Sequence, residues 1–197
     1  MAHAVDLARR FGIKVGAHPS LPDREGFGRR EMHLGRDGLR DALIWQIGAV
    51  KGFLNIAGLP LNHIKPHGLL NGWAGRDRDI AEALCDAAEP FGLGLFGQAG
   101  SELEAAARAR GLPYHAEFFI DINYDDQGRM AADKTKPVDP DWVAARLKRA
   151  VREGVLVSRT GKEIPFRFDV ACVHTDMPNP VEVAMAARRV LAELRGA

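Results

Sequence analysis

The chain has little cysteine, no long apolar run and no block of charge of one sign. Its 197 residues include 27 Lys and Arg and 26 Asp and Glu, for a formal net charge of +1. This balance argues against a nucleic-acid or membrane-surface partner, and no apolar run approaches the ~18 residues of a membrane helix. The two cysteines, Cys85 and Cys172, lie far apart and are expected to be buried, reduced thiols. With no signal peptide recognisable in residues 1–12, these absences predict a cytoplasmic protein.

What the sequence does contain is an alternation of short apolar segments with longer helical ones. A hydrophobic content of 46% suits one domain spanning residues 1–197. Five β–α units follow one another, which implies parallel strands joined by right-handed crossovers in an open sheet or a barrel. The predicted strands are 11–19, 59–68, 93–100, 112–121 and 169–176. The predicted helices after them are 37–58, 76–92, 101–111, 139–154 and 179–196.

Local signals support several of these helices. In 37–58 the apolar residues recur at three- and four-residue steps, which places them on one helical face. Ser101 with Glu104 forms a capping box, and Asp139 before Pro140 is typical of a helix start. Residues 155–168 predict a hairpin insertion that turns near Gly161.

Polar side chains gather where the predicted strands end. In parallel α/β folds, functional groups lie at the carboxyl ends of the strands. Three histidines end strands in the same manner, and a lysine and an aspartate accompany them. The predicted catalytic residues are therefore His18, Lys65, His67, Asp121 and His174.

The loop after the first strand is unusually long for a strand-to-helix connection and rich in charge. Gly26 and Gly28 allow the backbone to approach an anion, and Arg29 and Arg30 offer guanidinium donors to it. The alternative is that one arginine pairs with an acidic residue of the same loop. We expect an anion-binding loop.

Metal binding and acid–base catalysis both remain open for the strand-end residues. His18, His67, His174 and Asp121 are suitable ligands for a divalent ion, but no H-x-H or H-x-x-x-H spacing supports one, so acid–base chemistry is favoured. Residues 158–163 lack the spacing of a phosphate-binding loop, and no nucleotide-binding motif or serine-nucleophile elbow is present.

Three segments, GAHPSLPDREGFGRR, HIKPHG and CVHTDMP, resemble in order and spacing the LamB/YcsF family. The resemblance implies a (β/α) barrel of the glycoside hydrolase/deacetylase type with about seven strands. It also implies the activity of the A subunit of 5-oxoprolinase, the ATP-dependent opening of 5-oxoproline to L-glutamate with two partner subunits. The residues that we expect to bind substrate or an anion are Asp23, Arg29, Arg30, Tyr124 and Asp176.

The sequence departs from the family pattern in several places. Ile122 and Thr175 replace an arginine and a glycine of the family motifs, Asn71 is shifted by one place, and Lys134 stands near a usual arginine. The amino-terminal strands of the family have no counterpart here, which predicts an incomplete barrel. Two other readings stay open: a metal-dependent, deacetylase-like hydrolase of a C–N bond, and a non-catalytic relative.

Overall fold

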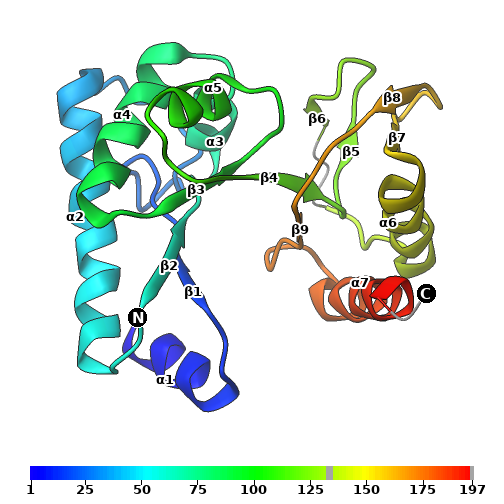
Figure 1. The fold of residues 1–197 in the computed structure, drawn as a ribbon, viewed down its shortest axis with the longest axis horizontal. Coiled ribbons are helices and arrows are strands. Elements are labelled where there is room, and N and C mark those ends of the chain that lie inside the picture. Colours follow the sequence, from blue (N-terminus) through cyan, green and yellow to red (C-terminus); the bar gives the residue numbers. More distant parts are fainter. Residues whose placement is uncertain (132–134, 196–197) are drawn as a thin grey trace. The chain divides into compact units, whose positions relative to one another are not determined.

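A computed structural model describes residues 1–131 and 135–195. Two compact units make up the chain, Met1–Ala116 and Glu117–Ala197, and we describe each by itself. Strand β4 (Tyr114–Phe119) runs from the first unit into the second (Figure 1). Lys134 and the end of the last predicted helix at Gly196 lie outside the described residues. The prediction of one domain over 1–197 stays a prediction.

The first unit is a run of parallel strands with helices between them. Its strands are β1 (Val15–Ala17), β2 (Leu61–Ile64), β3 (Gly94–Gly97) and the first half of β4, hydrogen-bonded in that order and all parallel. Its helices are α1 (Ala2–Phe11), α2 (Gly35–Ile56), α3 (Leu69–Ala74), α4 (Arg78–Ala88), the 3-10 turn η1 (Glu89–Phe91) and α5 (Glu102–Ala109).

Helix α2 supplies much of the core of the first unit. The predicted apolar face is confirmed, because Leu39, Leu43, Ile47 and Leu54 are all buried. Each buried leucine or isoleucine side chain stabilises the fold by roughly 1.5–3 kcal/mol relative to exposure. Helix α4 lies alongside α2 (Figure 1) and contributes Cys85, whose burial raises the pKa of its thiol to about 12.

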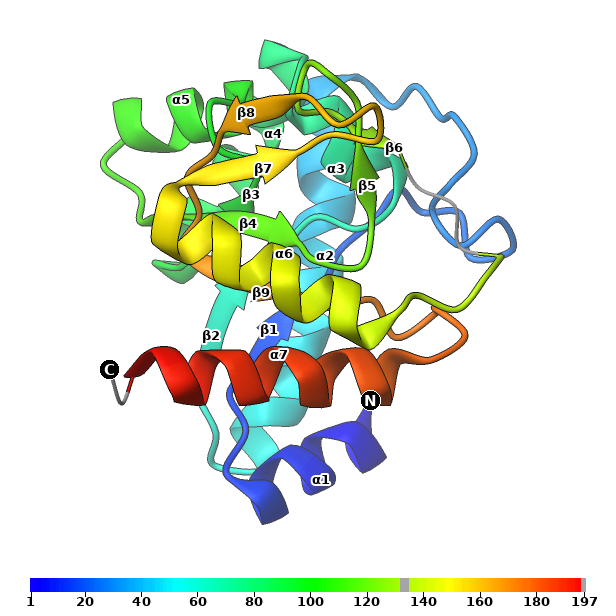
Figure 2. The same cartoon turned by 90° about the vertical axis from the view of Figure 1, so that its right-hand side faces the viewer.

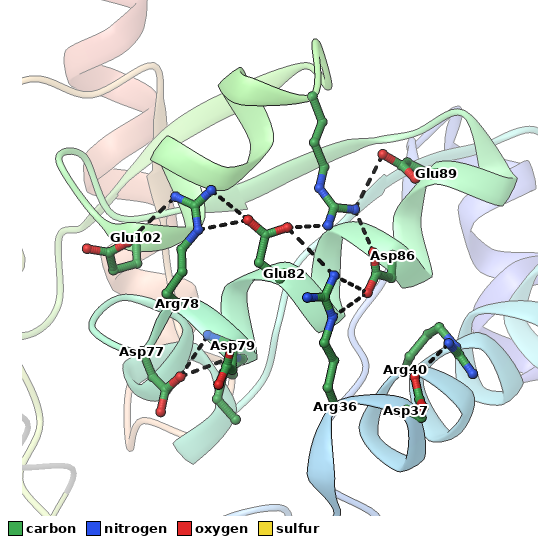
Figure 3. A network of polar contacts seen from close by, with 12 residues as sticks. Arg36, Asp37, Arg40, Asp77, Arg78, Asp79, Glu82, Asp86, Glu89 and Glu102 are labelled. Carbon is green, nitrogen blue, oxygen red and sulfur yellow. Dashed lines mark hydrogen bonds and ion pairs between the residues drawn. The ribbon is translucent and has the colours of Figure 1, made fainter.

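Helices α2, α4 and α5 are also joined by a network of ion pairs (Figure 3). Arg36 of α2 donates to Asp86 of α4 at 2.8 Å, and Arg78 of α4 donates to Glu82 at 2.7 Å. Arg110, just after α5, bonds both acids of α4, at 2.7 Å to Asp86 and at short range to Glu82. The network thus fixes the end of α5 against α4.

The second unit combines the end of β4 with two hairpins and two helices. The second half of β4 pairs in parallel with β9 (Val170–Cys172). Short antiparallel pairs form between β5 (Asn123–Tyr124) and β6 (Met130–Ala131), and between β7 (Val155–Val157) and β8 (Glu163–Pro165). Helices α6 (Pro140–Glu153) and α7 (Pro180–Arg195) lie side by side (Figures 1 and 2).

The α/β class predicted from the sequence is confirmed. The strand order β1-β2-β3-β4-β9 is parallel throughout, and five such strands are consistent with an incomplete barrel.

Side-chain caps at Ser101 and Asp139 begin α5 and α6 as expected, and the β7–β8 hairpin is present. Helix α3 and the β5–β6 hairpin were not predicted, because both are too short to show a periodic pattern. Within the described ranges, no helix has the length and apolar character needed to cross a membrane.

Candidate active site at the strand ends

Each predicted catalytic residue lies within three residues of the carboxyl end of a parallel strand. His18 follows β1, Lys65 and His67 follow β2, Asp121 follows β4, and His174 follows β9. The first three belong to the first unit and the last two to the second. The structure brings together the residues of each group, and the two groups are described separately.

In the first unit, His18 and His67 are hydrogen-bonded to each other. The β1–β2 ladder continues past the strands, with Lys65 N–H donating to Ala17 O and His67 N–H donating to Pro19 O, both at 2.9 Å. This register sets the two imidazoles edge to face, with ring centroids 4.8 Å apart and 3.1 Å between His18 Nε2 and His67 Nδ1. The outer nitrogens contact backbone carbonyls, with 2.7 Å from His18 Nδ1 to Lys65 O and 2.8 Å from His67 Nε2 to Phe27 O.

The long loop is folded around Asp23. The Asp23 carboxylate is buried and accepts hydrogen bonds from Gly26 N–H at 2.9 Å and from Arg30 Nε–H at 3.0 Å. The hydrogen bonds from Arg30, aided by that from Gly26, lower the pKa of Asp23 to about 2 against the effect of burial. Arg30 and Asp23 therefore bind each other, which is the alternative considered for this loop, and binding an anion at Arg30 would compete with this pair.

Close backbone approach explains two glycines at this site. At Gly68, φ is +61° and an added Cβ would lie 2.7 Å from Gly28 O, which accepts a hydrogen bond from Leu69 N–H. At Gly28, φ is +68° and a Cβ would lie 2.7 Å from Ser20 Cβ. Any larger residue would separate the loop from the end of β2, and would disturb the contact of His67 with the loop.

Phe27 and Gln46 are positioning residues that sequence reasoning missed. Phe27 is the one non-glycine residue of the described chain with positive φ, +56°, a conformation that costs energy for a bulky residue. This backbone aims the Phe27 carbonyl at His67, while the Arg29 guanidinium lies 5.3 Å from the Phe27 ring centre. Gln46 of α2 holds the start of the loop through both backbone groups of Ser20, at 3.0 and 2.7 Å.

In the second unit, Asp121 and His174 form an acid–histidine pair. Asp121 is buried, and its two oxygens accept from His174 N–H at 2.6 Å and from His174 Nδ1 at 2.9 Å. Burial by itself raises the pKa of the Asp121 carboxyl. The hydrogen bonds from His174 lower this pKa by more than burial raises it, so the pKa lies below its ordinary value. Because the ionised carboxylate only accepts, the hydrogen of the His174 ring lies on Nδ1 and Nε2 is the basic nitrogen.

Arg146 of α6 binds the backbone on both sides of Asp121. Its Nη1 donates to Ile122 O at 2.6 Å and to Ile120 O at 3.2 Å, the carbonyls on either side of Asp121. Its guanidinium lies 4.6–5.1 Å from the ring centres of Trp142, Phe118 and Tyr124. Sequence reasoning missed Arg146, although an arginine on the apolar face of a predicted helix was a visible signal.

The remaining predicted residues lie in different surroundings. Tyr124 is a core residue, 2% exposed, and its hydroxyl accepts from Phe119 N–H at 3.0 Å, so it acts on the end of β4 rather than at a surface that a substrate could reach. Asp176 is exposed, two residues after His174. A cavity of about 400 Å³ lies beside α6 and β7, and no predicted site residue lines it.

Metal binding gains no support from the side-chain geometry. Within residues 1–131 and 135–195, no three histidine, cysteine, aspartate or glutamate side chains gather as a metal-binding group. The donors of the two pairs instead hydrogen-bond each other or the backbone.

The fold and the strand-end residues define the class: a parallel α/β protein with candidate site residues at the carboxyl ends of its strands. The chain belongs to the LamB/YcsF family, whose model matches residues 1–196. It is 42% identical to the 5-oxoprolinase A subunit of Thermus thermophilus, over 96% of this chain and 78% of the relative. It is 38% identical to "Lactam utilization protein lamB" of Emericella nidulans, over 98% of this chain and 78% of that protein.

A solved structure matches the fold as well. The crystal structure of the lactam utilization protein from Thermus thermophilus superposes with a TM-score of 0.89 at 40% identity. The match covers 98% of this chain and 79% of that one.

Proposed function

We propose that this chain acts as the A subunit of a 5-oxoprolinase, which opens the lactam ring of 5-oxoproline to L-glutamate. The names of relatives at 35–42% identity support the substrate and the reaction. The observation in this chain that carries the proposal is the Asp121–His174 pair, because hydrolysis of an amide needs a base to activate water. We place it in a cytoplasmic complex with two partner subunits and ATP as co-substrate.

In this reaction His174 accepts the proton of the attacking water on Nε2. Asp121 holds the ring in the required tautomer and stabilises the imidazolium that forms. Its lowered pKa keeps the carboxyl ionised at neutral pH, where this role requires a negative charge. A positioned base of this kind contributes about 10²–10⁴-fold to the rate.

The first unit contributes positive charge in this proposal. A lactam is a resonance-stabilised amide, so transfer of a phosphoryl group to its oxygen would create a better electrophile. Cations near that oxygen stabilise such a transfer. We assign this stabilisation to Lys65, which follows β2, and to Arg29, which lies in the loop after β1. The fold type we propose is an incomplete barrel of the glycoside hydrolase/deacetylase type.

The test is an assay of ADP release that depends on 5-oxoproline, with the chain and its two partner subunits mixed. Wild type should release ADP, and Asp121→Asn should lower kcat by about 10²–10⁴-fold, because the amide no longer fixes the basic tautomer. Asp141→Asn, at an exposed aspartate at the start of α6, is the matched control and should match wild type. Absence of activity in the wild-type complex would contradict the function, and full activity of Asp121→Asn would contradict the site.

A further inference from the structure

The His18–His67 pair has all four ring nitrogens in hydrogen-bond contacts. The two inner nitrogens face each other at 3.1 Å. The two outer nitrogens face backbone carbonyl oxygens, those of Lys65 and Phe27, at 2.7 and 2.8 Å. Such a closed chain of contacts restricts where the ring protons can be.

Counting these protons fixes the charge of the pair. A carbonyl oxygen can only accept, so His18 Nδ1 and His67 Nε2 must each carry a hydrogen. Between the inner nitrogens, one donates and the other accepts, which requires a third hydrogen. Two neutral imidazoles carry two ring hydrogens in total, so three hydrogens correspond to one positive charge.

The surroundings of the pair favour this charge. The carbonyl dipoles of Lys65 and Phe27 point their negative ends at the two rings, and hydrogen bonding to the charged form stabilises it. The buried acidic residue of the loop, Asp23, is already bound to Arg30. The strained backbone of Phe27, with φ of +56°, is held where it places one of these carbonyls.

The same contacts make the pair unsuited to proton transfer with a substrate. Each of its nitrogens already has a partner within the protein, and delivering a proton would break the N–H···N bond between the rings. His174 differs, because its Nδ1 is bound to Asp121 while no described residue hydrogen-bonds its Nε2. The contacts of His174 therefore suit proton transfer, whereas those of the His18–His67 pair do not.

We propose that His18 and His67 form one cationic unit that binds a negatively charged oxygen of a substrate. The oxygen belongs to a carboxylate or to a phosphoryl group, since both present the same charge to the pair. The Arg29 guanidinium, on the Phe27 ring that packs against His67, adds to the positive charge of this region.

The charge can be measured on the chain alone, by nitrogen NMR of histidine rings at neutral pH. The pair should show one unprotonated ring nitrogen, whereas two neutral rings would show two. His18→Gln and His67→Gln assign the signals, and His67→Gln retains an amide donor for Phe27 O. His33→Gln is the control, because His33 stacks on Trp73 outside the pair and its loss should leave the pair's signals unchanged. Two unprotonated nitrogens in the pair would overturn the proposal.

The role in binding rests on the proposed function and is tested in the complete complex. His67→Gln should raise KM by about tenfold, the effect of losing one charge-assisted contact, and leave the shape of the kcat–pH profile unchanged. A rise in KM for 5-oxoproline identifies the carboxylate, and a rise in KM for ATP identifies the phosphoryl group. Unchanged KM values, or loss of one limb of the pH profile, would overturn the role. An inactive wild-type complex would refute the proposed function and leave the nitrogen count intact.

Discussion

Arg146 shows how a single buried cation can organise the surroundings of the Asp121–His174 pair. Burial lowers the pKa of its guanidinium to about 10, which still leaves it charged at neutral pH. Its Nε and Nη2 have no hydrogen-bond partner among the described residues, so the three aromatic rings around it provide the compensating contacts. The donor that remains, Nη1, holds the two carbonyls that flank Asp121.

We therefore expect Arg146→Lys to loosen the Asp121–His174 pair. Lysine keeps the charge but lacks the planar fork, and leaving one or both carbonyls unbonded costs about 1–3 kcal/mol of unfolding free energy. Urea unfolding measures this loss, and the ring-nitrogen signals of His174 report whether its hydrogen stays on Nδ1. Arg149→Lys, at a partly exposed arginine paired with Glu153 and Glu163, is the control and should change stability by less than about 0.5 kcal/mol. Unchanged His174 signals in Arg146→Lys would exclude a positioning role.

Asp23 makes the loop after β1 sensitive to acid. Its pKa falls from the ordinary 3.8 to about 2 in the folded chain, chiefly because Arg30 bonds it. The pair therefore contributes stability above pH ~4 that is lost progressively as the pH falls through about 2. The amide signal of Gly26, which donates to Asp23, should shift over this range, and Asp23→Asn should abolish the shift. Loss of the Gly26 contact well above pH 4 would contradict the expectation.

At the scale of elements, the ion pairs of Figure 3 connect α5 to α4 and α4 to α2. Arg110 is the most enclosed of the three arginines, 19% exposed, and contacts two acids of α4. Glu82 and Asp86 lie one helical turn apart and repel each other. Without Arg110, less positive charge would offset this repulsion.

Arg110→Met should therefore lower the free energy of unfolding by about 1–3 kcal/mol, more than an exposed ion pair contributes. The difference from wild type should shrink in high salt, because screening weakens both the attraction and the repulsion. Chemical unfolding at low and high ionic strength measures it. Arg9→Met removes an exposed pair with Asp6 and serves as the control. Equal effects of the two substitutions would show that the network adds nothing beyond its separate pairs.

At the scale of the whole molecule, β4 is the strand that belongs to both units. Its residues Tyr114 to Ala116 pair with β3 and its residues Glu117 to Phe119 pair with β9. Unfolding either unit removes the hydrogen bonds on one half of a continuous strand. We therefore expect the two units to unfold together, as the single-domain prediction requires.

Tryptophan fluorescence can test this coupling. Trp45 and Trp73 lie in the first unit and Trp142 in the second. Variants that keep only Trp73 or only Trp142 should give the same midpoint in urea, as a two-state transition requires. Circular dichroism of each variant controls for changes in stability caused by the substitutions. Two separated midpoints would mean that the units are independent domains.

Features that depend on neighbours in the chain could be predicted from the amino-acid sequence. Helix caps at Ser101 and Asp139, the apolar face of α2 and the β7–β8 hairpin follow from spacing and residue type. The sequence also predicts that the polar site residues lie just after the strands, because each strand of a parallel β–α unit ends in a loop that leads to the next helix. These signals gave the α/β class and the residues of the candidate site.

Which atoms those residues contact could not be predicted in this way, because the contacts form between distant parts of the folded chain. The positive charge that we propose for the His18–His67 pair depends on the carbonyls of Lys65 and Phe27, and Phe27 lies forty residues from His67. Tyr124 and Arg146 lie in one aromatic cluster because β4, β5 and α6 pack together, which no local pattern specifies. Charge state and burial depend on contacts between distant segments, so they arise only when the chain has folded.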